Sequence, residues 1–237
     1  MTTPLLNADL CENEPDDLTK ALFPLLDIAN LACGRHAGSE RKARLGLQLA
    51  IAHRTEVSAH PGLPGKHGRG NQVPSLAELE VELRAQLAWL HHLAVAECAV
   101  ITYLKPHGTL YHLAESDPEV RKVLLTLADD FRLAPICLAG GKVVRSAEKR
   151  GLQTLEEAFL DRNYRSSTAL VPRSHPRALL TGPGEIVARL QNYQSKGELE
   201  TIDHYPFSLR ADTFCLHSDT PNSLLILRAA RRAILSF

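Results

Sequence analysis

The sequence predicts an α/β protein in which residues 1–237 form one seven-stranded (β/α) barrel. Short apolar runs alternate with stretches of helical period seven times along the chain, and no break in composition divides it. Parallel neighbouring strands need crossover helices, so repeated β-then-α units indicate a parallel sheet. The same pattern fits a doubly wound open sheet. We prefer the closed barrel because no second domain is evident.

The first half of the chain supplies four of the expected strands. They lie at Leu5–Leu10, Asp27–Cys33, Glu56–His60 and Ala99–Lys105. Helices are expected at Leu18–Leu26, at Glu40–Arg54 and from Ser75 toward Glu97. The third helix has the clearest start, because Ser75 is followed three residues later by Glu78, as in a capping box. The stretch 61–74 is rich in Gly, Pro and His, which predicts a loop.

The second half supplies the other three strands, at Ala134–Ala139, Thr154–Leu160 and Thr213–His217. Its helices are expected at Asp117–Asp130, Gly141–Arg150, Gly184–Gln194 and Pro221–Ser236. Residues 161–181 show no periodicity and contain a long polar stretch. A connection of this length is uncommon unless it has a function, so we expect a mobile lid loop there.

Composition and missing motifs exclude several classes of protein. Lys plus Arg equal Asp plus Glu at 27 each, unlike the basic footprint of a nucleic-acid binder. The start is not a signal peptide, and no apolar run is long enough to cross a membrane. The five scattered cysteines form no Cys-x-x-Cys pair, so we expect free thiols in the cytoplasm. Phosphate-loop, dinucleotide and nucleophile-elbow motifs are missing. A small molecule or another protein is the expected partner, and a homo-oligomer is open.

Polar and ionisable residues gather after six of the seven expected strands. The candidates are Asn7, Asp9, Glu12, His36, His60, Lys105, His107, Asp161, Arg162, His217 and Asp219, with Arg173 in the loop after the sixth strand. In an α/β barrel all strands point the same way, so these segments meet at the C-terminal end, where active sites of such barrels lie. The sequence therefore predicts one shared site.

Four residues are the expected catalytic groups. Lys105, at a strand end, would stabilise a developing oxyanion, while Asp9 or His107 would activate water. Glu12 lies beyond the first strand and fits a site or solvent equally well. For Asp9 the alternative is a turn cap, and for Lys105 a rim residue with its charge in water.

The other residues are expected to bind substrate: Asn7, His36, His60, Asp161, Arg162, Arg173, His217 and Asp219. Arg162 or Arg173 suits a substrate carboxylate, although Asp161 and Arg162 would also fit a structural ion pair. A carboxylate with two imidazoles suits zinc or another divalent ion, so Asp9, His36 and His60 form a candidate metal triad. The alternatives are a surface loop for His36 and a hydrogen-bonded core histidine for His60.

Several motifs resemble the LamB/YcsF family, and the resemblance runs nearly end to end. They are L-N-x-D at 6–9, A-N-x-A-C-G at 29–34 with H-A-G at 36–38, A-H-P at 59–61, K-P-H-G-T-L-Y at 105–111, F-x-D-R-x-Y at 159–164, L-V-P-R at 170–173, and C-L-H at 215–217 with Asp219. The resemblance implies a seven-stranded barrel of the glycoside hydrolase/deacetylase type. It also implies the A subunit of a prokaryotic 5-oxoprolinase, which converts 5-oxoproline to glutamate with ATP hydrolysis, together with the B and C subunits.

The chain departs from the family pattern in loops around the site. Cys11 and Asn13 replace the glycines on either side of Glu12, Ser39 replaces an aspartate, and Asn163 and Ser218 replace glycines. Residues 65–67, Gly-Lys-His, stand where an aspartate-arginine run is usual. The ionisable residues are retained. This pattern indicates a divergent member with the same chemical groups, acting on 5-oxoproline or a related small lactam.

Three functions remain open at this level. The first is ATP-dependent ring opening of a cyclic amide, with ATP activation on the partner subunits because no phosphate loop exists here. The second is a metal-dependent deacylase or deacetylase-like hydrolase acting on a small amide. The third is a non-catalytic barrel that serves as a binding or scaffold subunit.

Overall fold

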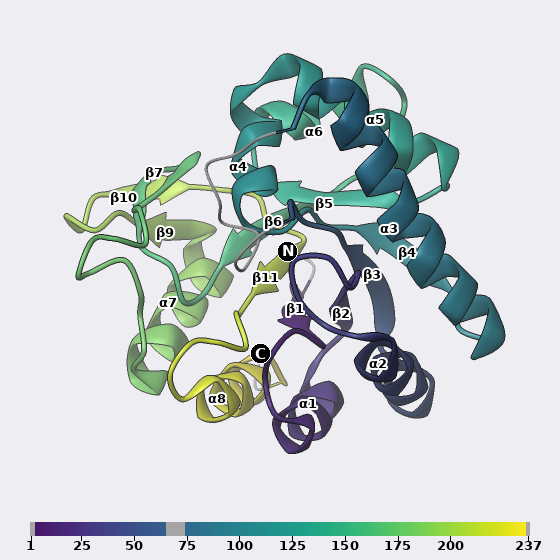
Figure 1. Cartoon of the computed structure of the whole chain (residues 1–237). Coiled ribbons are helices and arrows are strands. Elements are labelled where there is room, and N and C mark those ends of the chain that lie inside the picture. The colour runs from purple at the N-terminus through teal and green to yellow at the C-terminus, as the bar shows by residue number, and fades with distance from the viewer. Residues whose placement is uncertain (1–2, 65–73, 236–237) are drawn as a thin grey trace.

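The structure is a computed structural model that describes residues 3–64 and 74–235 (Figure 1). Seven strands close into a barrel in the order β1-β11-β6-β5-β4-β3-β2, and every neighbouring pair is parallel. The strands are β1 (Leu5–Leu10), β2 (Ile28–Ala32), β3 (Glu56–His60), β4 (Ile101–Leu104), β5 (Ala134–Leu138), β6 (Leu155–Phe159) and β11 (Thr213–Cys215). The predicted seven-stranded barrel is confirmed, and each strand lies within two residues of its expected bounds.

Helices surround the barrel and bury the outer face of the strands (Figure 1). They are α1 (Asp16–Leu22) with the short 3₁₀ helix η1 (Phe23–Leu25), α2 (Glu40–His53), α3 (Leu76–Ala96), α4 (Gly108–Ser116), α5 (Pro118–Asp130), α6 (Lys142–Glu148), α7 (Pro183–Lys196) and α8 (Ser223–Leu235). One hydrophobic core of buried residues runs through these elements. Within the described ranges, no helix is both long and apolar enough to cross a membrane.

Local sequence explains where the long helices begin. The Ser75 hydroxyl accepts from the Glu78 backbone N–H while the Glu78 side chain accepts from Ser75 N–H, which completes the predicted capping box of α3. Ser39 caps α2 by accepting from Lys42 N–H. Serine replaces aspartate here without loss, because both are good N-cap residues.

The structure adds elements that periodicity did not predict. Helix α4 begins at Gly108, a weak helix former, and its N-cap residue His107 makes no side-chain cap bond, so a start signal is missing. Two short antiparallel pairs lie between β6 and β11: β7 (Tyr164–Ser166) with β8 (Ala169–Leu170), and β9 (Glu198–Glu200) with β10 (Pro206–Ser208). Their strands are too short for an alternating pattern. The predicted loop at 61–74 and the predicted end of the last helix at Ser236 lie partly or wholly outside the described residues.

Candidate functional site

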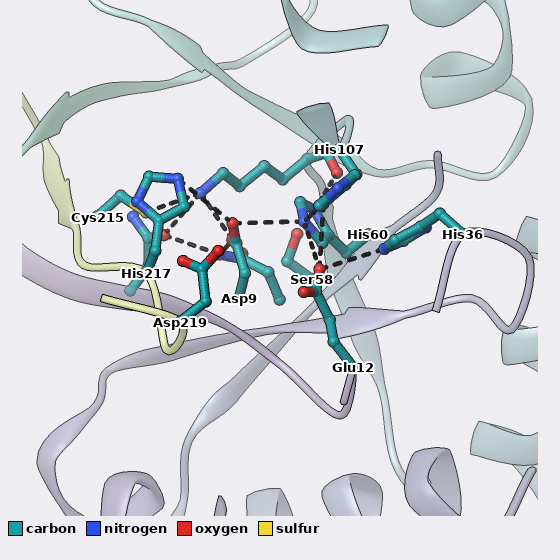
Figure 2. Close-up of polar contacts among 12 residues, drawn as sticks. Asp9, Glu12, His36, Ser58, His60, His107, Cys215, His217 and Asp219 are labelled. Atoms are coloured by element: carbon teal, nitrogen blue, oxygen red, sulfur yellow. Dashed lines mark hydrogen bonds and ion pairs between the residues drawn. The ribbon is translucent and has the colours of Figure 1, made fainter. Parts of the chain in front are cut away.

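Two groups of ionisable side chains lie next to each other at the C-terminal end of the barrel (Figure 2). The first, here called the His-Glu group, consists of Glu12, His36, His60 and His107. The second, here called the Asp9 group, consists of Asp9, Cys215 and His217. Within each group the potential ligand atoms all lie within 4.8 Å of one another. The sequence prediction of one shared site is therefore matched by two adjoining clusters.

The His-Glu group takes one residue from the end of each of four neighbouring strands. Glu12 follows β1, His36 follows β2, His60 ends β3 and His107 follows β4. Glu12 Oε1 is 3.2 Å from His36 Nε2, 3.1 Å from His107 Nδ1 and 3.8 Å from His60 Nε2. The His36 and His107 rings stack with centroids 4.0 Å apart. Three imidazoles thus face one carboxylate oxygen.

Two features of the chain around β3 support this packing. His60 Nδ1 lies 2.7 Å from the Lys105 carbonyl oxygen, which can only accept, so Nδ1 carries the proton and the Nε2 lone pair faces the group. Gly62 leaves room for the stacked rings, because a Cβ there would lie 2.7 Å from His36 Nδ1. Gln86 of α3 holds Gly62 in place, accepting from its N–H and donating to its carbonyl.

Burial and hydrogen bonds shift the pKa values of two members of the His-Glu group, Glu12 and His36. Burial alone would raise the pKa of Glu12, but hydrogen bonds from His107 and His36 and the nearby imidazoles hold that pKa well below its usual value. Burial lowers the pKa of His36 to about 4, and the hydrogen bond to Glu12 offsets this only in part. At neutral pH Glu12 is therefore a carboxylate and His36 a neutral imidazole.

Lys105 occupies the centre of the barrel end, beside the Asp9 group. Its Nζ is 2.9 Å from Asp9 Oδ1, 2.9 Å from Glu157 Oε1 and 3.0 Å from Cys215 Sγ. Burial disfavours the ammonium, but Asp9 and the other partners outweigh it and raise the pKa of Lys105 well above its usual value. Lys105 is thus a buried cation held between two carboxylates.

Asp9 is ionised because the stabilisation by its neighbours outweighs the cost of burying its charge. Burial would raise its pKa, yet the nearby His60 ring and the Lys105 ammonium lower it well below the usual value. Its Oδ1 also accepts from Asn30 Nδ2 at 2.9 Å. Cys215 remains a neutral thiol, because burial raises its pKa well above the usual value.

His217 is oriented by a buried carboxylate. Its Nδ1 lies 3.0 Å from Asp161 Oδ2, and the same oxygen accepts from the backbone N–H of His217 and from the Thr220 hydroxyl. Burial would raise the pKa of Asp161, but His217 and these hydrogen bonds lower it to about 2. The other ring nitrogen, Nε2, lies 3.8 Å from Asp9 Oδ2. A carboxylate that fixes one imidazole nitrogen leaves the other free for acid–base work.

A cavity of about 410 Å³ opens above these residues. The residues that line it include Lys105, His60, His107, Phe159, Arg162 and His217. Leu170, Val171, Pro172 and Arg173 from the predicted lid loop line it as well. A second cavity, of about 440 Å³, borders Glu12, His36, His107 and Asp219. His107 lines both cavities, so the His-Glu group lies between them. Cavities of this size suit small ligands.

Arg162 and Arg173 form the cationic part of the 410 Å³ cavity. Arg162 is buried, and burial together with the nearby Arg173 lowers its pKa. Arg162 donates to the Val171 carbonyl, but its Nε has no hydrogen-bond partner among the described residues. Arg173 Nη1 lies 3.4 Å from Asp219 Oδ2. This corner of the cavity can accept an anion.

Most residues singled out from sequence border one of the two cavities, but Asn7 and Asp161 do not. Asn7 is fully buried. Its side-chain amide donates to Thr213 and accepts from Asn30 and Lys105. Asp161 is also fully buried and supports His217. Asn7 contacts Lys105, and Asp161 contacts His217. That the two residues bind substrate stays a prediction. In the candidate metal triad, Glu12 and His107 join His36 and His60, while Asp9 belongs to the other group.

Sequence reasoning missed Glu157, the second carboxylate at Lys105. It lies within β6 and is fully buried. A signal existed: Glu157 lies on the same face of the strand as the apolar residues Leu155 and Phe159, where an acidic residue is costly unless paired. Cys215 and Asn30 appeared only within motifs. Their contacts with Lys105 and Asp9 could not be read from spacing.

Among the described departures from the family pattern, only Cys11 has a positive φ, at 60°. Glycine adopts that conformation without cost, and cysteine does so with strain. The Cys11 side chain is buried and lies near Gly46, where a Cβ would be 2.6 Å from its Sγ. Asn163 and Ser218 have ordinary φ, so the backbone there does not require glycine. The altered stretch 65–67 lies outside the described residues.

The comparisons agree with the architecture. The LamB/YcsF family model matches residues 5–236. The A subunit of 5-oxoprolinase from Haemophilus influenzae (strain PittEE) is 36% identical over 92% of this chain and 90% of its own length, and that of Thermus thermophilus is 37% identical over 91% and 88%. The crystal structure of a lactam utilization protein from Thermus thermophilus superposes with a TM-score of 0.90 at 34% identity, covering 99% of this chain and 97% of that one. This chain belongs to the LamB/YcsF family.

Proposed function

We propose that this chain is the A subunit of an ATP-dependent 5-oxoprolinase in the cytoplasm. It would open 5-oxoproline, or a related small lactam, to glutamate by hydrolysis. ATP would activate the substrate on the partner B and C subunits, because the sequence has no phosphate loop. The relatives named as the A subunit of 5-oxoprolinase support the assignment. The observation that carries it is a small cavity in which a buried lysine, a carboxylate-oriented histidine and two arginines meet.

Arg162 and Arg173 are the proposed site for the substrate carboxylate. Burial lowers the pKa of Arg162, repulsion from Arg173 lowers it further, and the Arg162 Nε lacks a described partner. A carboxylate placed between the two guanidiniums would remove both penalties and form charge-assisted hydrogen bonds. The apolar residues Leu170 and Val171 would cover the hydrocarbon part of the ring, and residues 161–181 would act as the lid.

His217 is the proposed general base. Asp161 fixes its Nδ1, which leaves Nε2 to take a proton from water. Sequence reasoning favoured Asp9 or His107 for this step. The low pKa of Asp9 and its hydrogen bonds with Lys105 and Asn30 make it a weak base. We therefore assign Asp9 to holding Lys105, and keep His107 as the alternative base beside Glu12.

Lys105 is the proposed electrostatic stabiliser. An unstrained lactam resists hydrolysis, and attack by water places negative charge on the amide oxygen. A fixed ammonium at the cavity floor would stabilise that charge without rearranging when the reaction occurs. If ATP phosphorylates the amide oxygen on the partner subunits, water would add to the ring carbon and the C–N bond would break to give an acyl phosphate. Hydrolysis of that acyl phosphate would release phosphate and glutamate, and Lys105 would stabilise the charge on the phosphate oxygens.

The test is a reconstitution of this chain with the B and C subunits, ATP and 5-oxoproline, with glutamate release as the readout. We expect release to require this chain and to fall at least 100-fold in His217→Asn. His53→Asn, an exposed histidine at the end of α2, is the matched control and should keep full activity. Glutamate release that never depends on this chain would refute the assignment.

The His-Glu group favours one second candidate, a metal-dependent deacylase acting on a small amide. Such an enzyme would work without the B and C subunits and without ATP, which separates the two proposals in the same assay. If Lys105→Ala and Asp9→Ala variants match the wild type in the assembled complex, the non-catalytic role is correct instead.

A further inference from the structure

We infer that Glu12, His36, His60 and His107 bind one divalent transition-metal ion. The site would serve the proposed ring opening by activating a carbonyl or a water molecule. Its existence does not depend on which substrate the chain accepts. Four consecutive strands of the barrel each deliver one donor atom to the same point (Figure 2).

The spacing of the donor atoms fits a small coordination sphere. Glu12 Oε1 is 3.1 Å from His107 Nδ1 and 3.2 Å from His36 Nε2, while His107 Nδ1 and His60 Nε2 are 3.0 Å apart. For zinc bonds of about 2.0–2.1 Å in a tetrahedron, neighbouring donors lie roughly 3.4 Å apart. The longest of these contacts, 3.8 Å between Glu12 Oε1 and His60 Nε2, still allows a shared ion.

The tautomer of His60 is already the one that a metal ligand needs. Its Nδ1–H donates to the Lys105 carbonyl, so Nε2 presents a lone pair toward Glu12 and His107. Metal-binding histidines commonly donate their other ring N–H to a carbonyl or carboxylate, which fixes the ring. Gln86 holds the adjoining turn through two hydrogen bonds to the Gly62 backbone, beside the rings of His36 and His107.

The neighbouring Asp9 group does not offer a second site, although its three donors are also close together. The Lys105 ammonium already occupies that position, 2.9 Å from Asp9 Oδ1 and 3.0 Å from Cys215 Sγ. A divalent ion there would face an ammonium with a raised pKa. Each group therefore binds a different cation. The Asp9 group binds the Lys105 ammonium, and the His-Glu group would bind the metal ion.

The donor set selects the class of ion. Three imidazoles and one carboxylate suit zinc, iron(II), cobalt(II), nickel(II) or manganese(II), whereas magnesium and calcium prefer oxygen ligands. One anionic ligand leaves a net positive charge on the bound ion. Both cavities reach the group through His107, so an exchangeable ligand can approach it.

The experiment uses untagged full-length protein, stripped with chelator and dialysed, in the absence of substrate and partner subunits. Zinc chloride is titrated by calorimetry, bound zinc is counted by elemental analysis, and cobalt(II) loading is followed by its visible absorption spectrum. We expect one equivalent of zinc. Affinity should weaken roughly 100-fold or more in His36→Ala and His107→Ala, and also fall in Glu12→Gln.

Two histidines beside the group provide matched controls. His112 lines the same cavity but lies outside the group, so His112→Ala should keep one equivalent of zinc. His217→Ala should keep it too, whereas zinc loss in that variant alone would move the ion to the Asp9 group and overturn the inference. Wild-type protein that holds less than about a fifth of an equivalent would also overturn it. Circular dichroism checks that each variant is folded, and no outcome relies on glutamate release.

Discussion

At the ends of β1 to β4, three imidazoles and Glu12 converge on one point, whereas at the ends of β6 and β11 arginines and apolar side chains line an open cavity. In the first half of the site, at the ends of β1 to β4, the three histidines are buried and in contact with one another. The second half holds Arg173 in a partly exposed pair with Asp219. The difference supports the two proposals, a metal ion in the first half and a substrate carboxylate in the second.

The largest expected effect concerns Lys105, which lies between the two halves. Lys105→Met leaves Asp9 and Glu157 buried without their cation, so unfolding free energy should fall by about 3–5 kcal/mol and glutamate release should be lost. Chemical denaturation and the reconstituted assay measure the two effects. Lys105→Met combined with Glu157→Gln should recover part of the stability but no activity. Recovered activity would show that Lys105 only balances charge.

The next effect tests the second half through Asp161. In Asp161→Asn, His217 loses the partner that fixes its tautomer, so kcat should fall by about 10²–10⁴-fold. Steady-state kinetics of the reconstituted complex measure this effect. A change in KM alone, with kcat unaltered, would contradict the proposed base.

The loss of stability in Asp161→Asn should also depend on pH. The pKa of Asp161 is lowered to about 2 in the folded protein, below the value of about 3.9 expected when unfolded. Its carboxylate therefore contributes stability above pH 4, roughly 2–3 kcal/mol, which is lost as the pH falls toward 2. The stability gap between wild type and Asp161→Asn should shrink over that range. A gap independent of pH would mean that Asp161 acts through packing alone.

A smaller effect tests the density of the first half. Gly62→Ala places a Cβ 2.7 Å from His36 Nδ1, so unfolding free energy should fall by about 1–3 kcal/mol. Gly184→Ala in α7 is the matched control, because its Cβ would meet no atom within 4 Å. Its stability should change little or rise slightly. Equal melting temperatures for the two variants would show that the imidazole stack can shift.

The smallest effect on stability is expected in the exposed part of the second half. Arg173→Ala removes a partly exposed pair with Asp219, worth less than about 1 kcal/mol, so the melting temperature should hardly move. If Arg173 binds the substrate carboxylate, KM should rise about tenfold or more while kcat changes little. An unchanged KM would leave Arg162 as the sole carboxylate site.

The sequence by itself determined the seven parallel strands, favoured a closed barrel over an open sheet, and indicated the end at which the candidate residues lie. Strand periodicity located all seven strands, and parallel strands necessarily bring residues such as His60, Lys105 and His217 to one end. Motif similarity identified the family. These properties depend on local pattern and on chain direction, which spacing records.

Only the tertiary structure decided which side chains meet. It paired Lys105 with Glu157, turned Asn7 and Asp161 away from the cavities, and grouped Glu12 and His107 with the histidines instead of Asp9. Contacts of this kind depend on the order of strands around the barrel and on the stagger between them. Residues 96 or 110 positions apart become neighbours through that closure, which no local pattern in the sequence can specify.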